Sequence, residues 1–399
     1  MERFDVVVIG GGAAGVAAAL SATRAGARVA LVRSGPGATA LMAGGWHDAP
    51  PSSLVDALAG AGHELTGCQG PLPHPDGTVV PCAIAPPSHA AASLTHDAAS
   101  VMVCGIAGLP GFRAAALAAL WSDAAGLPEA LESVTVTLDA TPAAGWSPVS
   151  LAAHLDRDPD LLPRALTGVV RERRPDRVIL PAVLGLDDPA RVLAALTDRV
   201  GVPAGEALGS LPSVPGWRLD RALQRVMADA GVRMIAGRVI AADVQERTVR
   251  SVTIAAGIAR ASNGGSALGP TVTAAGCYIL ATGKYIGGGI TADAEFEEPA
   301  LGCDVALERF ARTIDDPGAA LVLTDPVRSE AQPVLSAGVR VDRDGRPLNP
   351  GGDVFVANVF VAGAVRAGTE TAALGLGTAT RDGWTAGERA ATHASGTER

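Results

Sequence analysis

The most constraining feature of the chain is a glycine pattern, Gly10-x-Gly12-x-x-Gly15, which lies between two segments of opposite character. Residues 4–9 before it form a short, mostly β-branched run, which is typical of a buried parallel strand. An alanine-rich helix is expected after it, and residues 28–32 are expected to form a second strand. The pattern therefore lies inside one strand–helix–strand unit, which predicts an α/β fold built on a parallel sheet.

Each glycine of the pattern is expected to have its own structural role. Gly10 permits the tight turn out of the strand, Gly12 lets a phosphate approach the backbone, and Gly15 lets the helix pack on the strands. The first turn of the helix, at Ala13 and Ala14, offers N–H groups and the positive end of the helix dipole. A glycine turn that serves packing alone is the alternative. Because strand, helix and chain position agree, the pattern predicts binding of a cofactor phosphate.

The end of the second strand departs from the usual dinucleotide pattern. An Asp or Glu there normally accepts hydrogen bonds from an adenosine ribose, but this chain has Arg33, which can only donate. Arg33 is consistent with a phosphate neighbour, as in NADP sites, with a cofactor that lacks adenosine, or with a solvated surface arginine. Because FMN has a single phosphate and no second ribose, we expect FMN, with FAD as the second choice.

Two later strands complete the expected cofactor domain. One ends in Ala-Thr-Gly, a strand end common where flavin disulfide-reductase-like folds cross close to the cofactor, which predicts contacts from Thr282 and Gly283. The other ends in Gly363 and Ala364, at a place where an Asp that binds the flavin ribityl chain is usual. Each alone is compatible with an ordinary core strand. In this order after the glycine pattern, they predict a flavin fold.

Composition excludes several classes of protein. With 399 residues, of which 48% are hydrophobic, the chain is large enough for two lobes with sizeable cores. The net charge of -9, without a Lys/Arg cluster, argues against a nucleic-acid partner. The five cysteines form no C-x-x-C pair, which excludes a Cys-ligated iron–sulfur cluster, and no metal site is expected. Neither a signal peptide nor a membrane-length apolar stretch is visible, so we expect a cytoplasmic protein without direct membrane insertion.

The order of expected strands, helices and Gly/Pro-rich stretches also predicts the domain layout. We expect a Rossmann-like FAD/NAD(P)-binding three-layer fold with an inserted α/β cap, or substrate, domain. The expected segments are 1–50, 233–285 and 336–399 for the flavin-binding domain, and 51–232 with a returning segment 286–335 for the cap.

Six stretches, in order along nearly the whole chain, give it a more specific resemblance. They are 4–12 (FDVVVIGGG), 108–113 (GLPGFR), 180–186 (LPAVLGL), 211–219 (LPSVPGWRL), 281–289 (ATGKYIGGG) and 336–339 (SAGV). Through them the sequence resembles the B subunits of the anaerobic glycerol-3-phosphate dehydrogenases, a flavoprotein family of about this length. The chain departs from that family at residues 43–47, where members tend to carry polar side chains, and in the glycine-rich stretch 373–378.

The resemblance implies an FMN-binding subunit of a larger assembly. The implied partners are an FAD-containing catalytic subunit and an iron–sulfur subunit that anchors the assembly to the membrane. The implied substrate is a small phosphorylated polyol, glycerol 3-phosphate, which is oxidised to dihydroxyacetone phosphate while electrons pass towards quinone. The chain is then expected in the cytoplasm, at the inner face of the cell membrane through a partner subunit.

A few single residues are candidates for catalysis or further cofactor contacts. Lys284, the only lysine, follows the Ala-Thr-Gly turn and is expected near the flavin or an anionic substrate, unless it is a surface lysine. Arg218 lies in a Pro- and Gly-flanked stretch, where it either contacts a phosphate or braces a domain interface. Gly44 and Gly45 are expected where the chain crosses the cofactor. His47, just after them, is a candidate acid or base, with a structural histidine as the alternative.

Two other functions stay open on the sequence. A stand-alone FAD-dependent oxidoreductase, acting on another small hydroxy acid or amine, would bleach with its substrate without partners. A cofactor-free assembly subunit would keep the fold alone, and the basic Arg33 and apolar Ala364 at the two usual acidic positions are consistent with it. Identifying the ligand released by acid separates these functions.

Overall fold

The chain forms two compact units, and each is described by itself. The computed structural model describes residues 2–95, 100–127, 131–256, 270–292, 296–306, 333–369 and 371–397. Unit 1 consists of Met1–Thr39, Pro50–Ala57 and Leu223–Arg399. Unit 2 consists of Ala40–Ala49 and Leu58–Ala222.

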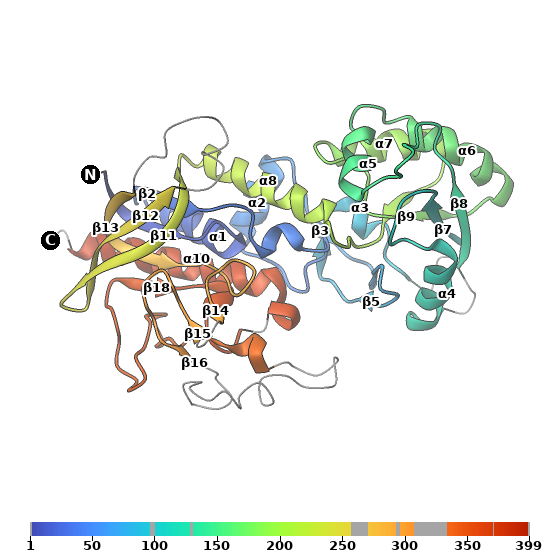
Figure 1. The fold of residues 1–399 in the computed structure, drawn as a ribbon. Coiled ribbons are helices and arrows are strands. Elements are labelled where there is room, and N and C mark those ends of the chain that lie inside the picture. Colours follow the sequence, from blue (N-terminus) through green and yellow to red (C-terminus); the bar gives the residue numbers. More distant parts are fainter. Residues whose placement is uncertain are drawn as a thin grey trace. The chain divides into compact units, whose positions relative to one another are not determined.

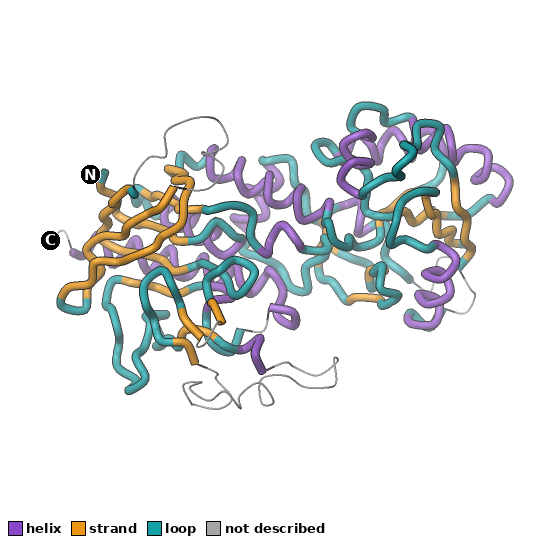
Figure 2. The backbone as a smooth tube through the Cα atoms, viewed as in Figure 1, coloured by secondary structure: helices purple, strands orange, loops and turns teal. Residues whose placement is uncertain are grey.

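Unit 1 is built on a parallel sheet with the strand order β11-β2-β1-β13-β18. Its strands are β1 (Arg3–Ile9), β2 (Val29–Arg33), β11 (Arg233–Gln245), β13 (Thr271–Leu280) and β18 (Val359–Val361). Strand β12 (Thr248–Ala256) pairs antiparallel with both β11 and β13 and makes a three-stranded ribbon with them, which Figure 2 shows in orange. The long strands β11 and β13 thus leave the parallel sheet to form this ribbon.

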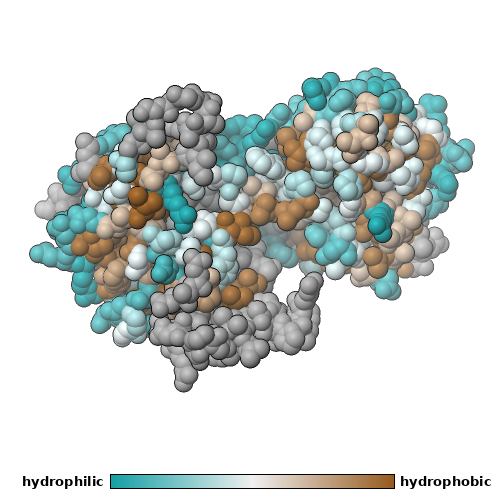
Figure 3. All heavy atoms as spheres, viewed as in Figure 1, coloured by the Kyte–Doolittle hydropathy of each residue, from teal (hydrophilic) through white to brown (hydrophobic). Residues whose placement is uncertain are grey.

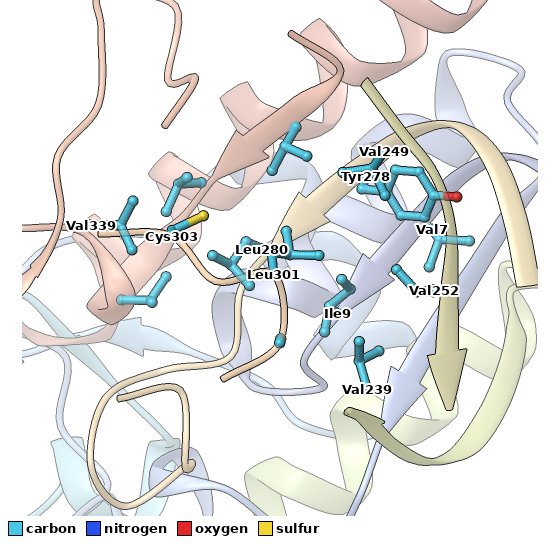
Figure 4. Packing of buried hydrophobic residues seen from close by; sticks show 14 of the residues in the cluster. Val7, Ile9, Val239, Val249, Val252, Tyr278, Leu280, Leu301, Cys303 and Val339 are labelled. Atoms are coloured by element: carbon cyan, nitrogen blue, oxygen red, sulfur yellow. The ribbon is translucent and has the colours of Figure 1, made fainter. Parts of the chain in front are cut away.

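The β-branched run in β1 is explained by burial on both faces of the sheet. The side chain of Val8 faces the helix α1 (Ala13–Arg24), because its Cγ1 lies 3.4 Å from where a Cβ on Gly15 would stand. Val7 and Ile9 point to the other face and join a buried cluster with residues of β11, β12 and β13 (Figure 4). A strand covered on both sides needs apolar residues at every position rather than at alternate ones.

The first and last helices pack closely against each other, because glycines without side chains lie where they meet. A Cβ on Gly383 in α10 (Thr371–Thr397) would lie 2.0 Å from the carbonyl oxygen of Ala14, and one on Gly387 would lie 2.3 Å from that of Ala18. The hydroxyl of Ser21 adds a hydrogen bond to the carbonyl oxygen of Trp384 (2.8 Å). Two glycines one turn apart therefore let the two backbones touch.

We predict that Gly387→Ala lowers the free energy of unfolding by roughly 1–3 kcal/mol, because the added methyl group forces the helices apart. Urea unfolding followed by circular dichroism measures the effect. The matched control is Gly396→Ala in the same helix, where a Cβ would meet no atom within 4 Å. An equal response of the two variants would show that the contact with Ala18 contributes nothing.

Unit 2 has its own parallel sheet with the order β10-β9-β7-β8 (Figure 1). The strands are β7 (Val101–Ile106), β8 (Glu132–Val136), β9 (Arg177–Leu180) and β10 (Ala204–Glu206), and the helices between them are α4 (Ala114–Ala124), α5 (Pro148–Leu155), α6 (Leu161–Arg173) and α7 (Pro189–Val200). Along β7, Met102 and Cys104 pack into one buried cluster and Val101 and Val103 into another. The sheet is therefore covered on both faces, as expected of β/α units.

Helix α7 shows how local sequence fixes an element of this unit. Asp188 caps its N-terminus by accepting a hydrogen bond from the Arg191 backbone N–H (3.1 Å), and Pro189 occupies the first helical position. Gly201 ends the helix in the left-handed conformation, with φ 75°. The start and stop of α7 thus follow from three residues.

The remaining elements complete both units. The helices are α2 (Ser52–Gly60), α3 (Pro87–Ala90) and α8 (Val214–Asp229), with 3-10 turns η1 (Ala38–Leu41), η4 (Pro333–Ser336) and η5 (Gly363–Val365). The paired short strands are β3 (Thr66–Gly67) with β6 (Ile84–Ala85), β4 (Leu72–Pro73) with β5 (Val79–Val80), β14 (Thr291–Ala292) with β15 (Phe296–Glu297), and β16 (Val305–Ala306) with β17 (Gly338–Val339).

The predicted fold class is confirmed, because a parallel sheet with a third, antiparallel layer carries an inserted α/β unit. The segment boundaries differ from the expected ones: unit 2 begins at Ala40 and omits Pro50–Ala57, and the described parts of 286–335 group with unit 1. Most of that returning segment, 293–295 and 307–332, lies outside the described residues. The role of unit 2 as a substrate cap stays a prediction.

The surface is mixed in character. Figure 3 shows hydrophobic residues interspersed among hydrophilic ones on the visible face of each unit. Within the part of the chain that the structure describes, no helix is both long and apolar enough to cross a lipid bilayer.

Candidate functional site

The glycine turn after β1 is fixed by two backbone contacts. Gly10 has a φ of 117°, and a Cβ there would lie 2.2 Å from the carbonyl oxygen of Ala281, at the end of β13. A Cβ on Gly15 would lie 1.9 Å from the carbonyl oxygen of Gly10. Both positions exclude any side chain, as expected for a turn that packs a helix onto its strands.

Gly12 differs from these two glycines. Its φ of -78° is open to any residue, and a Cβ there would meet only the Thr39 Oγ1 atom, at 3.3 Å. Gly12 is the N-cap of α1 and supplies no capping side chain. At the first turn, the N–H groups of Ala13, Ala14 and Gly15 have no partner inside the helix. A phosphate fits this arrangement of donors.

Thr39, which was not predicted from the sequence, lies at this turn. Its Oγ1 atom accepts a hydrogen bond from the Ala13 N–H (3.0 Å), and its side chain is buried. A hydroxyl that accepts one hydrogen bond still has its own hydrogen to donate. The only sequence signal was a threonine in the loop that follows β2, and such a loop has no fixed spacing to its target.

Arg33 lies alongside the same turn. A Cβ on Gly11 would stand 2.7 Å from the Arg33 Cδ atom, and the Arg33 Nε–H donates to the carbonyl oxygen of Gly35 (3.0 Å). The aliphatic part of Arg33 thus covers Gly11. The end of β2 presents donors here, where an acidic residue would present acceptors.

The Ala-Thr-Gly turn after β13 is packed just as closely. The Thr282 Cα atom lies 2.9 Å from where a Cβ on Gly10 would stand, so the two turns touch. Cβ atoms on Gly287 and Gly289 would lie 2.4 Å and 2.1 Å from the carbonyl oxygens of Thr282 and Gly283. The Thr282 hydroxyl is buried and has no hydrogen-bond partner among the described residues. A buried hydroxyl of this kind is satisfied when a ligand supplies a partner.

The strand β18 delivers the last predicted contacts. Gly363 follows it with a φ of 72°, and a Cβ there would stand 2.6 Å from the Cβ of Ala14. Its neighbour Ala364 is half-buried in the turn η5. Unit 1 therefore brings several predicted residues together around the glycine turn and the first turn of α1. They are Gly10, Gly12, Ala13, Ala14, Gly15, Arg33, Thr282 and Gly363, while Gly283 and Ala364 follow Thr282 and Gly363 in the chain.

Lys284 is buried rather than on the surface, with an exposed fraction of 6%. Its ammonium donates hydrogen bonds to the carbonyl oxygens of Leu335 and Thr369. The side chain thus ties the loop after β13 to η4 and to the segment before α10. Two backbone carbonyls give the buried cation the acceptors that it needs.

In unit 2, the predicted residues Gly44, Gly45 and His47 lie in one loop. Gly44 has a φ of 117°, and a Cβ there would stand 2.6 Å from the Nε2 atom of His89. A Cβ on Gly45 would stand 2.3 Å from the sulfur of Cys82. His47 itself is exposed. The two glycines are thus required by their neighbours, whereas His47 faces solvent.

Arg218 is 4% exposed and sits in a buried ion pair of unit 2. Its Nη1 and Nη2 groups donate to the two carboxylate oxygens of Glu206 (2.7 and 3.0 Å), and its Nε–H donates to the carbonyl oxygen of Gly185 (2.7 Å). The Ser88 hydroxyl and the Leu184 N–H also donate to Glu206 (2.7 and 2.6 Å). The predicted phosphate contact of Arg218 stays a prediction, with the guanidinium here bound to protein groups.

Charge and burial set the protonation of this cluster. Burial alone would raise the pKa of Glu206, but the charge and hydrogen bonds of Arg218 outweigh it and bring the pKa to about 2. Burial lowers the pKa of His89, which keeps the imidazole neutral near pH 7. The cluster thus holds one cation, one anion and one neutral ring.

No group of three or more His, Cys, Asp and Glu side chains that could hold a metal ion occurs in the described ranges. All five cysteines are free thiols. The described residues at the glycine turn offer backbone N–H groups and hydroxyls, which suit an anionic organic cofactor.

Comparison with known proteins identifies the family of this chain. A relative from Halobacterium salinarum (strain ATCC 29341 / DSM 671 / R1), described as the probable B subunit of an anaerobic glycerol-3-phosphate dehydrogenase, is 32% identical over 445 residues, covering 97% of both chains. The chain belongs to the family of anaerobic glycerol-3-phosphate dehydrogenase B subunits. The family predicted from the six sequence stretches is thus confirmed, and the chain is a flavin-dependent oxidoreductase of this family.

Further matches agree with this family. The sequence profile of the family described as "FAD binding domain" matches residues 5–63 and 166–379. The B subunit of the anaerobic glycerol-3-phosphate dehydrogenase of Pectobacterium carotovorum subsp. carotovorum (strain PC1) is 30% identical over 203 residues, which cover 51% of this chain and 43% of that protein.

Solved structures show a more distant likeness. The 3-ketosteroid delta1-dehydrogenase from Sterolibacterium denitrificans superposes with a TM-score of 0.41 at 13% identity, with all of both chains covered. The open conformation of a flavocytochrome c3 fumarate reductase gives 0.40 at 14% identity, covering 98% of this chain and 79% of that one. Neither likeness is close enough to indicate a substrate.

The buried pair makes a prediction about stability and pH. Because Arg218→Met leaves Glu206 buried without its cation, we expect it to cost roughly 3–5 kcal/mol at pH 7, measured by urea unfolding. The lowered pKa of Glu206 means that the pair stabilises the fold above about pH 4.5 and loses this effect as the pH falls towards 2.

The variant Glu206→Gln/Arg218→Met should therefore lose less stability than the wild type between pH 5 and pH 3. Arg173→Met, which removes the half-exposed partner of Glu132, is the control and should change little. Parallel pH profiles for the wild type and the double variant would contradict the lowered pKa.

Proposed function

We propose that this chain is a flavin-containing redox subunit that relays electrons from the oxidation of glycerol 3-phosphate, to dihydroxyacetone phosphate, towards quinone. Family membership supports a flavin-dependent redox role. The observation that carries the proposal is the first turn of α1. There Gly12 adds no side chain, the N–H groups of Ala14 and Gly15 have no partner inside the helix, and the Thr39 hydroxyl, which accepts from Ala13, keeps its own hydrogen to donate. That set of donors matches the phosphate of a flavin nucleotide.

The flavin contacts of unit 1 divide by chemistry. Gly12, Ala13, Ala14 and Thr39 would surround the phosphate, to which the Ala14 N–H and the Thr39 hydroxyl would donate, while the Ala13 N–H holds Thr39 in place. The buried Thr282 hydroxyl, together with Gly283, Gly363 and Ala364 nearby, would line the path of the remainder of the cofactor. A bound flavin would supply the capacity to take up electrons from a partner subunit and to pass them on.

We propose FMN as the cofactor, and the position of Arg33 supports it. Arg33 packs over Gly11 at the end of β2, so its side chain can only donate at the place where the ribose diol of an adenosine needs an acceptor. The family described as "FAD binding domain" supports FAD instead. The identity of the released flavin decides between the two.

The partners are proposed because the relatives are each one subunit of a dehydrogenase, which indicates an assembly of several chains. We propose an FAD-containing catalytic subunit and an iron–sulfur membrane-anchoring subunit. The absence of a C-x-x-C pair from the sequence supports an iron–sulfur cluster on another chain. The assembly would place this chain at the inner face of the membrane.

The three residues expected to act on substrate receive different roles in this proposal. Lys284 and Arg218 would position loops, because their charged groups bind backbone carbonyls and Glu206. His47 is exposed and remains the candidate acid or base.

The first test is the identity of the bound ligand. We expect the purified chain to be yellow, and acid to release FMN in a ratio of about one per chain, identified by chromatography and absorbance. Release of FAD would change the cofactor and keep the redox role. Protein that stays colourless after incubation with either flavin would instead favour the cofactor-free assembly subunit. Bleaching by glycerol 3-phosphate without partners would contradict a relay.

A pair of glycine variants tests the phosphate position. We expect Gly12→Ala to weaken flavin binding by about tenfold or more without unfolding the protein, because its methyl group fits the fold but fills the phosphate space. Flavin fluorescence titration measures the affinity. Gly15→Ala is the matched comparison and should destabilise the apoprotein itself, since its Cβ would lie 1.9 Å from the Gly10 carbonyl oxygen. Unchanged affinity in Gly12→Ala would place the phosphate elsewhere.

A further inference from the structure

The imidazole of His89, in α3, is held in one tautomer. The side chain has an exposed fraction of 0%, and its Nδ1 atom lies 3.1 Å from the carbonyl oxygen of Glu206. Because a carbonyl oxygen can only accept, Nδ1 carries the proton, and Nε2 of the neutral ring is a bare acceptor. The other edge of the ring therefore has no hydrogen to donate.

The Nε2–Cδ2 edge of the His89 ring packs against the backbone of Gly44. A Cβ on Gly44 would lie 2.6 Å from Nε2 and 2.8 Å from Cδ2 of His89. Nε2 has no hydrogen-bond partner among the residues that the structure describes. The ring consequently contacts Gly44 by van der Waals packing alone, and it does so where only a glycine fits.

The ring is also prevented from moving away. Glu206 accepts from the ring through its carbonyl oxygen, and its carboxylate is fixed by Arg218, by the Ser88 hydroxyl and by the Leu184 N–H. Burial lowers the pKa of His89, so the ring is neutral near pH 7. Its Nε2 atom lies 4.0 Å from the Glu206 Oε2 atom, which is beyond hydrogen-bond distance.

We propose that His89 is a positioning residue. Its neutral ring, which the Glu206–Arg218 pair keeps in place, packs against the Gly44–Gly45 turn and fixes the conformation of that turn. The inference rests on the proposed function for its ligand, because Gly44 and Gly45 are predicted from the sequence to contact the cofactor. The shape of the ring carries the role, since Nε2 makes no hydrogen bond among the described residues.

Two substitutions separate the ring from its hydrogen bond. His89→Asn keeps a donor for the Glu206 carbonyl oxygen and removes most of the ring, whereas His89→Phe keeps a ring and removes that donor. The amide hydrogen exchange of residues 43–47 is measured in the full-length apoprotein. We expect exchange to be about tenfold or more faster in His89→Asn and close to the wild-type rate in His89→Phe. Ser88→Ala, next to His89 on the same helix, removes one of the groups that fix Glu206 but leaves the ring, and should raise the exchange rate less than His89→Asn does.

The opposite order, with protection kept by Asn and lost with Phe, would overturn the proposal, and so would a Phe variant that does not fold. Flavin titration of the same proteins adds the link to the ligand, with affinity expected to fall about tenfold in His89→Asn alone. If the wild type binds neither FMN nor FAD, the proposed function fails, while the exchange rates still decide the role of His89.

Discussion

The structure of unit 1 depends on a contact between backbones at the glycine turn after β1. The carbonyl oxygen of Ala281 occupies the place where Gly10 would carry a Cβ, and the carbonyl oxygen of Gly10 occupies the same place at Gly15. These approaches join β1, α1 and the end of β13 without any side chain between them. The first helical turn therefore follows directly on a turn without side chains, and its N–H groups have no partner inside the helix, which is the arrangement that suits a phosphate.

Much of this arrangement follows from local sequence. The β-branched run, the alanine-rich helix and the Ala-Thr-Gly strand end are patterns of neighbouring residues, and the structure has β1, α1 and β13 at those places. The mechanical roles of Gly10 and Gly15 could be assigned for the same reason, because the tight turn and the packing of the helix depend on spacing within six residues, whereas the role of Gly12 towards a phosphate stays a prediction. The replacement of the usual Asp or Glu by Arg33 was also visible, because the run of apolar residues in β2 locates the end of that strand.

The remaining features could not be predicted, because they depend on residues that are distant in sequence. Thr39 reaches Ala13 across 26 positions, and Ser88 reaches Glu206 across 118. Lys284 and Arg218 were expected to act on ligands, since loops rich in Gly and Pro often present charges. In the folded chain both are buried, where a charge requires protein partners, and the partners are backbone carbonyls and a carboxylate. Burial, which a single sequence shows poorly, changed their interpretation.

The two units thus hold glycine turns by different means, and the difference has consequences. In unit 1 the turn is fixed by backbone contacts, which carry no titratable group, so its geometry should be insensitive to pH. In unit 2 the Gly44 turn packs against the imidazole ring of His89, and the position of this ring depends on the buried carboxylate of Glu206 and the guanidinium of Arg218. A buried pair stabilises only while both members keep their charge, and Glu206 keeps its charge down to a pKa of about 2. The position of the His89 ring in unit 2 is therefore only as stable as the Glu206–Arg218 ion pair. Removing one member of that pair should loosen the Gly44 turn, which is expected to contact the cofactor.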